Sequence, residues 1–304
     1  MTHELPLVIF TIAAALSAGS FVTLGVIHVL GAKVPQRVMD RVTDPALYAI
    51  GPLLLLGLLA SMFHLGSPLR AINSIKHFPN SALSVEIVVG MAFLGLGALF
   101  AVMQWFKVGG HRLRQVVAVV TALVGLGLVY AISQVYSLET VPAWATVYTP
   151  LRFFITAFLL GGLAVGAALV INLYVLNKRG RLQTERENNL VRRSLEGIAL
   201  GSIVMMGLKL IGLPAYIGYL GTHQDPAAQA SLRILTEQYG FWSGAQTVLV
   251  FLAVAAMAVL LYLLARGKDI RLVMYLAVAA FVLGLAGEFI GRQLFYAAMV
   301  RTGM

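Results

Sequence analysis

The sequence predicts an all-α, polytopic integral membrane protein, and three observations support this prediction. Of the 304 residues, 60% are hydrophobic and only 11% are charged, and the mean hydropathy of +0.88 is far above that of a soluble domain. The hydrophobic residues come in blocks, each long enough to cross a hydrocarbon core about 30 Å thick as a helix. Strand-length segments in which apolar and polar residues alternate are absent. Helices are therefore the way to hydrogen-bond every backbone N–H and C=O group in lipid.

Eight such blocks are expected to be transmembrane helices: 5–32, 45–66, 82–106, 115–136, 150–176, 194–220, 240–265 and 270–298. The first is expected to be a retained helix, because no Lys or Arg precedes it, Glu4 is acidic, and the run exceeds the apolar region of a signal peptide. We interpret the chain as one domain, 1–304. Two four-helix halves, about 1–176 and 194–304, are the alternative.

The Lys and Arg residues are distributed unevenly between the two sides of the membrane. Fifteen of the 22 fall in the first, third, fifth and seventh connections, five fall on the other side, and Lys209 and Arg292 lie inside blocks. The positive-inside rule therefore predicts cytoplasmic odd connections and places both termini outside, in the periplasm. The net charge of +10 is then a topological signal, and nucleic acid is not an expected partner. The charged fifth connection, 177–193, is expected to be a solvated loop.

Cysteine and histidine usage limits the redox groups that the chain could hold. There is no Cys, so any iron–sulfur cluster must belong to another protein. A membrane haem b needs two imidazoles at similar depth, whereas His28 is expected near the cytoplasmic face and His64 near the opposite face. We therefore expect no haem and no metal site.

Ionisable side chains inside the expected helices gather toward the outer face. His64 ends the second helix, Glu86 lies in the first turn of the third, and Glu288 lies about 25 Å along the last helix. Arg292 and Tyr296 follow Glu288 on the same face. One charge in the membrane core costs about 3 kcal/mol. Several such groups at one depth favour a proton-handling pocket open to the outer compartment.

Each of these groups also has a structural interpretation. His64 could bond to a neighbouring loop, Glu86 could complement a helix dipole, and Glu288 and Arg292 have the spacing of a self-neutralising pair. Lys209 could pair with a carboxylate that the sequence does not identify. Beside Glu288, the small residues of Gly287-x-x-x-Gly291 are expected to let a neighbouring helix approach closely.

Several stretches together resemble the membrane-anchor subunit of anaerobic dimethyl sulfoxide reductase. They are HELPLVIFT at 3–11, SMFHLGSPLRAINS at 61–74, SALSVEI at 81–87, TVPAWATVYTP at 140–150 and GEFIGRQLFY at 287–296. The most specific parts are the His-Leu-Gly-Ser-Pro segment and the closing Gly-Glu-Phe-Ile-Gly-Arg segment. Together the stretches span nearly all eight expected helices.

The resemblance implies a three-subunit complex in the bacterial inner membrane. A molybdopterin catalytic subunit and an iron–sulfur electron-transfer subunit would be the partners, with this chain as the anchor that oxidises menaquinol. The resemblance associates His64 and Glu86 with the quinol site. Arg70, beyond His64, is expected to shape the covering loop, and Glu288, Arg292 and Tyr296 to complete the pocket.

Three other functions are compatible with parts of the sequence. The chain could anchor another molybdenum reductase, acting on polysulfide, thiosulfate or tetrathionate, because the terminal substrate never touches the anchor. A proton-coupled transporter could use Lys209 and Glu288 as relays, but it would need polar groups in both leaflets. A purely structural anchor would need neither His64 nor the outer cluster of ionisable groups.

Overall fold

The computed structural model describes residues 4–62, 75–180 and 184–303, and within these ranges every regular element is helical. The expected all-α class is therefore confirmed. The long helices are α1 (Leu5–Leu30), α2 (Gln36–Met62), α4 (Ala82–Trp105), α5 (His111–Tyr136), α6 (Tyr148–Lys178), α7 (Glu185–Thr222), α9 (Gly240–Ala265) and α10 (Ile270–Ala297). Three short elements join them: the 3₁₀ turn η2 (Ile75–His77), α8 (Pro226–Arg233) and the π-helical turn η3 (Ile234–Gln238).

Seven of the described helices are long and apolar enough to cross a membrane: α1, α4, α5, α6, α7, α9 and α10. The chain is accordingly a multi-pass membrane protein. The expected span 45–66 falls on α2 and on residues after Met62 that lie outside the described ranges. That eighth span and the periplasmic position of the termini stay predictions.

The fifth connection is more helical than the sequence suggested. α7 begins at Glu185, so most of the charged stretch 177–193 continues a helix that was expected to start at 194. A capping box fixes this start, because the Thr184 hydroxyl accepts from the Glu187 backbone N–H and the Glu187 carboxylate accepts from the Thr184 N–H. Two orphan donors of the first turn are thereby satisfied. The stretch 177–193, expected as a solvated loop, therefore overlaps the end of α6 and the first turns of α7.

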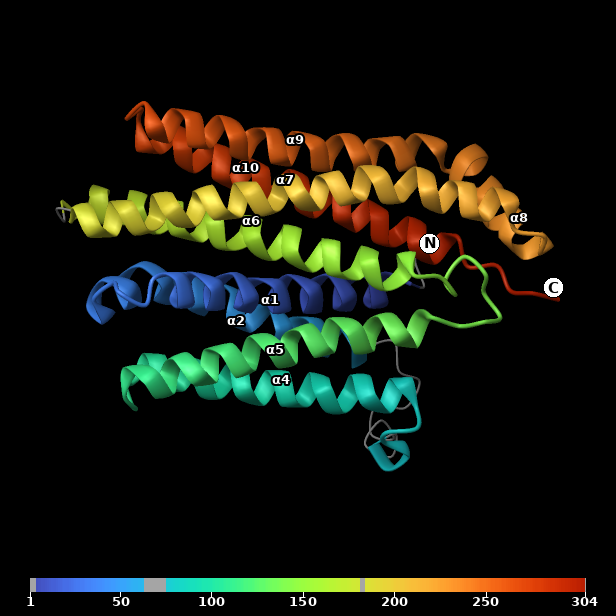
Figure 1. Ribbon diagram of the computed structural model, residues 1–304, viewed down its shortest axis with the longest axis horizontal. Coiled ribbons are helices and arrows are strands. Elements are labelled where there is room, and N and C mark those ends of the chain that lie inside the picture. Colours follow the sequence, from blue (N-terminus) through green and yellow to red (C-terminus); the bar gives the residue numbers. More distant parts are fainter. Residues whose placement is uncertain (1–3, 63–74, 181–183, 304) are drawn as a thin grey trace.

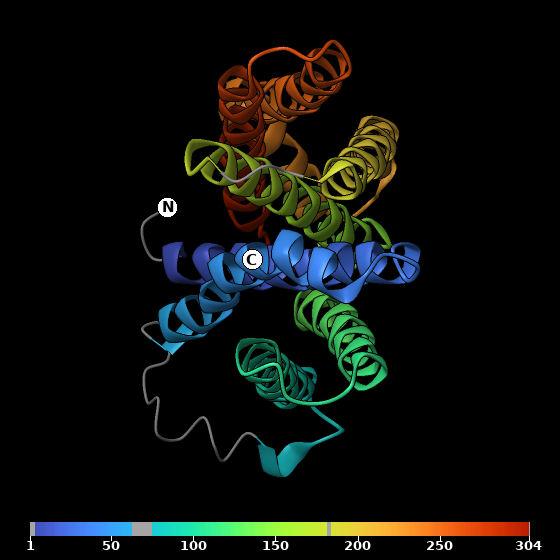
Figure 2. The ribbon, with the colours of Figure 1, turned by 90° about the vertical axis from the view of Figure 1, so that its left-hand side faces the viewer.

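The helices α1 and α6 form the centre of the bundle (Figure 1). α7, α9 and α10 lie on one side of this pair and α4 and α5 on the other, an arrangement that the end-on view also shows (Figure 2). α1 packs against α2, α5 and α6, while α6 also packs against α7 and α10. Phe153 and a row of leucines on α6 are fully buried as a result, namely Leu159, Leu160, Leu163 and Leu169.

The close approach of α1 and α6 depends on two glycines. A Cβ atom at Gly19 would overlap the backbone of Ala157, and a Cβ atom at Gly161 would overlap the backbone of Gly19 and Ser20. Small residues allow helix backbones to come this near in a membrane, where packing rather than water drives association. The Ser20 hydroxyl lies 3.5 Å from the Gly161 carbonyl oxygen to which it donates.

Charged side chains join α2, α4 and α5 at the end of the bundle that is expected to be cytoplasmic. The Lys107 ammonium lies 3.0 Å from the Asp40 carboxylate and 2.5 Å from that of Asp44. Gln104 donates to Asp44 over 2.8 Å and accepts from the Arg114 guanidinium over 2.6 Å. Burial disfavours the Lys107 ammonium, but its hydrogen bonds to Asp44 and Asp40 outweigh burial and raise the pKa of Lys107 above its usual value.

Candidate functional site

An ion pair between α7 and α10 marks the candidate site. Lys209 contacts one oxygen of the Glu288 carboxylate, and the Thr156 hydroxyl of α6 donates to the other oxygen over 2.7 Å. Only 5% of Glu288 is exposed. Three helices thus converge on one carboxylate, and the partner of Lys209 that the sequence left open is Glu288.

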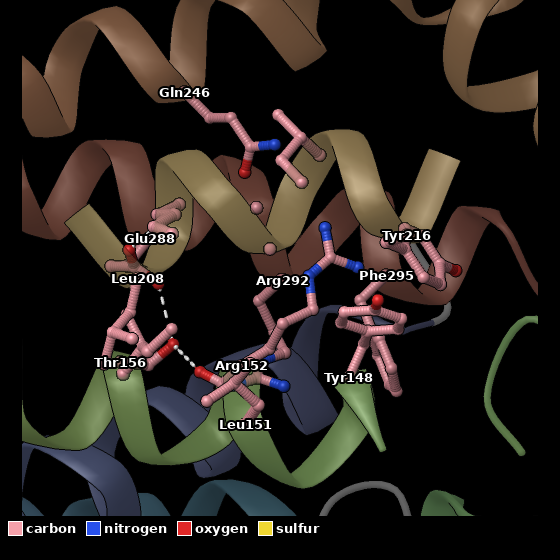
Figure 3. Close-up of a pocket in the computed structure, with 15 residues that line it drawn as sticks. Tyr148, Leu151, Arg152, Thr156, Leu208, Tyr216, Gln246, Glu288, Arg292 and Phe295 are labelled. Atoms are coloured by element: carbon pink, nitrogen blue, oxygen red, sulfur yellow. Dashed lines mark hydrogen bonds and ion pairs between the residues drawn. The ribbon is translucent and has the colours of Figure 1, made fainter. Parts of the chain in front are cut away.

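These groups stand at one end of a cavity between α6, α7, α9 and α10. Figure 3 shows Glu288 and Thr156 at this end and the rings of Tyr148 and Tyr216 at the other. Other polar groups in the lining come from Arg152, Gln246 and Arg292. The cavity has about 40 Å³, which is room for a few water molecules.

Arg292 has an unusual environment for a cation. It is 4% exposed, its guanidinium carbon lies 3.6 Å from the centre of the Phe153 ring, and its Nε atom has no hydrogen-bond partner in the described structure. The expected pair between Glu288 and Arg292 is therefore not formed as a contact, because Lys209 and Thr156 occupy the carboxylate. A cation on an aromatic face is stabilised by the ring quadrupole, so the Phe153 ring offsets part of the cost of burying this charge.

Glycines of α10 bring a glutamine toward the cavity. A Cβ atom at Gly291 would collide with the side chain of Gln246, and one at Gly287 would meet the backbone and side chains of α9. The Gly287-x-x-x-Gly291 spacing therefore gives the close approach that the sequence predicted, and the neighbouring helix is α9. This approach places the Gln246 amide against the same cavity as Arg292.

Tyr296 belongs to an aromatic cluster beside the cavity. Its hydroxyl donates to the Tyr136 hydroxyl over 2.8 Å, and both rings lie edge-on to Trp144. The Trp144 indole N–H in turn donates to the Phe295 carbonyl over 2.9 Å. Tyr296 does not line the cavity of Glu288; it borders a separate hollow near Glu4.

Glu86 is buried in α4, with 9% of its surface exposed. No hydrogen bond or ion pair joins it to any other residue that the structure describes. Glu86 lies on α4, which packs against α5, the helix of Tyr136. Glu86 lines neither the Glu288 cavity nor the hollow beside Tyr296.

The predicted residues thus divide into three groups. Glu288 and Arg292 share one cavity, while Tyr296 and Glu86 lie outside it. His64 and Arg70 lie outside the described residues. His28, the other intramembrane histidine, has its Nε2 atom 3.2 Å from the Thr43 hydroxyl.

Sequence reasoning missed several polar residues of the cavity, namely Thr156, Arg152, Gln246 and Tyr216. Thr and Gln are uncharged, so their presence in a hydrophobic block does not indicate the energetic cost that marks a charged residue in lipid. Arg152 and Tyr216 lie near helix ends, where they look like ordinary interfacial residues. Among the described residues, no three His, Asp or Glu side chains gather as metal ligands.

Comparison with known proteins finds similarity over the whole bundle. The model of a family described as DMSO reductase anchor subunit (DmsC) matches residues 1–298. The C subunit of the anaerobic dimethyl sulfoxide reductase of Escherichia coli (strain K12) is 31% identical over 306 residues, covering 99% of this protein and 97% of the relative. The subunit of the same name from Haemophilus influenzae is 29% identical over 302 residues, with the same shares covered.

Proposed function

The chain belongs to the DMSO reductase anchor subunit family, and on this premise we propose that it oxidises menaquinol and passes the electrons to an iron–sulfur partner subunit. A molybdopterin catalytic subunit completes the proposed complex, and the apolar helices hold it in the bacterial inner membrane. The chain has no Cys, so the cluster that receives the electrons belongs to the partner. The quinol site must then lie close to the docked partner.

The observation that best supports this proposal is the isolation of Glu86. Oxidation of menaquinol to menaquinone releases two protons with its two electrons, so the site needs a proton acceptor near the quinol oxygens. Glu86 is buried and has no counter-ion among the residues that the structure describes. A carboxylate without a structural partner in a membrane helix is expected to have a functional one.

We assign the second proton-accepting role to His64, which the family resemblance associates with the quinol site. An imidazole changes its charge within the physiological pH range with little perturbation. His64 precedes the described segment that leads into α4 and Glu86. Arg70 lies between these two residues in the sequence and is proposed to orient the quinol head group.

Glu288, Arg292 and Tyr296 are proposed as supporting groups. Arg292 carries a buried N–H without a hydrogen-bond partner among the described residues. Tyr296 donates a hydrogen bond to Tyr136 of α5, the helix that packs against α4, which carries Glu86. Glu288 is already neutralised by Lys209, so we assign it a positioning role rather than proton transfer. The 40 Å³ cavity beside Glu288 is sized for water.

The experiment is a comparison of two electron donors in membranes that contain the whole complex. A menaquinol analogue must react at the anchor, whereas a low-potential redox dye can reduce the partner clusters directly. Glu86→Gln is expected to lower analogue-dependent reduction of the terminal acceptor about a hundredfold and to leave dye-dependent reduction unchanged. Glu139→Gln, at an exposed carboxylate on the expected outer side, is the matched control and should change neither rate.

The same assay separates quinol oxidation from a purely structural anchor. A structural anchor predicts equal analogue-dependent rates for the wild type, Glu86→Gln and His64→Ala, and that result would refute the proposed chemistry. The terminal acceptor is a separate matter, since it contacts the catalytic subunit alone. We propose dimethyl sulfoxide, in line with the family, over polysulfide, thiosulfate or tetrathionate.

A further inference from the structure

A wide groove lies between α1 and α7, away from the candidate site. It has about 800 Å³, and its floor is formed by Phe158 and Gly162 of α6. α1 and α7 both pack against α6, which leaves the space between them open along the bundle. None of the residues assigned above to quinol oxidation lines it.

One end of this groove is basic. Lys33 follows α1, and Arg186 and Arg193 lie two turns apart on one face of α7. Among the described residues that line the groove, there is no carboxylate to balance these three cations. Two neighbouring acidic side chains are engaged elsewhere: Glu187 pairs with Arg41, and Glu196 pairs with Arg192.

The rest of the groove is mainly apolar, with Thr23, Asn189, Ser194 and Ser202 as its polar residues. Val26 and Leu30 of α1 are 49% and 82% exposed along one wall. Gly197 and Gly201 form part of the other wall, and a Cβ atom at either position would meet nothing within 4 Å. The α7 residues that line the groove recur every three or four positions, so they form one continuous face of the helix.

The dimensions match one leaflet of a bilayer. From Arg193 to Met205, the deepest α7 residue in the lining, a helix rises about 18 Å. Half of a hydrocarbon core about 30 Å thick is about 15 Å. The groove therefore joins a cationic end at head-group depth to an apolar channel as long as an acyl chain.

We propose that this groove is a binding site for an anionic glycerophospholipid, such as phosphatidylglycerol. Lys33, Arg186 and Arg193 would contact the phosphate, and one acyl chain would lie along Gly197 and Gly201. Basic pockets between transmembrane helices on the cytoplasmic side are suited to anionic head groups. A second protein helix would be a poorer match, because its charged end would need to supply several carboxylates at one level.

The test is native mass spectrometry of the full-length protein in mild detergent, with phosphatidylglycerol and phosphatidylcholine of identical acyl chains as probes. The wild type is expected to retain phosphatidylglycerol preferentially. Arg186→Gln with Arg193→Gln should weaken that binding about fivefold for each cation removed. Arg192→Gln is the matched control, since Arg192 neighbours the same face but pairs with Glu196, and it should retain the preference.

A second variant tests the apolar channel independently of charge. Gly197→Leu should reduce phosphatidylglycerol binding without lowering thermal stability, whereas Gly218→Leu, at another open position on α7, should leave binding intact. Equal retention of the two lipids by the wild type would overturn the proposal. So would a dimer of the protein that Gly197→Leu dissociates, because the groove would then hold a second copy. Menaquinol turnover plays no part in these readouts.

Discussion

Lys209 of α7 and Glu288 of α10 neutralise one another inside the bundle, and Thr156 of α6 bonds to the same carboxylate. Lys209 has 16% of its side chain exposed and Glu288 has 6%. The pair therefore connects three helices at a depth where an unpaired charge is costly. Its contribution to stability can be separated from any role in quinol oxidation.

Replacing Lys209 with methionine should destabilise the protein. The substitution keeps much of the side-chain volume but leaves the Glu288 charge buried without its cation, which costs about 3 kcal/mol. Thermal unfolding in detergent measures this cost as a lowered Tm. The double variant Lys209→Met with Glu288→Gln should recover most of the loss, and a double variant as unstable as Lys209→Met alone would contradict the pairing.

Adding one methyl group at Gly161 should disrupt the centre of the bundle. The new Cβ atom would overlap the backbone of Gly19 and Ser20, and backbone cannot move aside as a flexible side chain can. We expect Gly161→Ala to cost more than about 3 kcal/mol, seen as poor yield and a large fall in Tm. Gly95→Ala, where a Cβ atom meets nothing within 4 Å, should be neutral or slightly stabilising.

The hydrogen bond between Tyr136 and Tyr296 should contribute about 1 kcal/mol. Tyr136→Phe leaves the buried Tyr296 hydroxyl without its 2.8 Å acceptor, so Tm should fall, and Tyr296→Phe should have a similar effect. The double variant should be less unstable than the sum of the two single variants, because both remove one interaction. Strict additivity would show that the bond contributes nothing. Tyr130→Phe, at a ring that is 54% exposed, serves as the control.

The Lys107 ion pairs give a stability contribution with a defined pH dependence. The pKa of Lys107 is raised in the folded protein, so the contribution is complete below the unfolded pKa and is lost as pH rises through the folded pKa. Lys107→Gln should lower the free energy of unfolding at pH 8, and with it Tm. The loss should be less than about 1 kcal/mol, because 47% of the side chain is exposed. The difference in Tm between this variant and the wild type should become smaller above about pH 11. A constant difference across this range would argue against the assignment.

The fold class could be predicted because each long apolar block has one solution in lipid. The bounds of α9 and the beginning of α4 agree closely with the expected blocks. The beginning of α7 could not be predicted from hydropathy, since Thr184 and Glu187 start the helix through polar capping in a charged stretch. Hydropathy detects the part of a helix that contacts lipid but not the helical turns that extend beyond the lipid.

The site was harder to predict than the fold, for a physical reason. The sequence shows that Lys209 and Glu288 are costly in lipid, but pairing depends on how α7 and α10 are rotated about their axes. The spacing of Arg292 from Glu288 suggested a local pair. In the structure the Arg292 guanidinium instead lies over the ring of Phe153 in α6. The periodicity within one helix does not specify a contact between two helices.

The contact of Gly19 with Gly161 also bears on how the protein is made. α2, α4 and α5 are synthesised between the two helices that form this contact, so α1 enters the membrane well before its main neighbour exists. Until α6 arrives, the small-residue face of α1 must be covered by lipid or by an insertion factor. Completion of the bundle core is therefore a late event in biogenesis, and truncation before α6 should yield inserted but loosely associated helices.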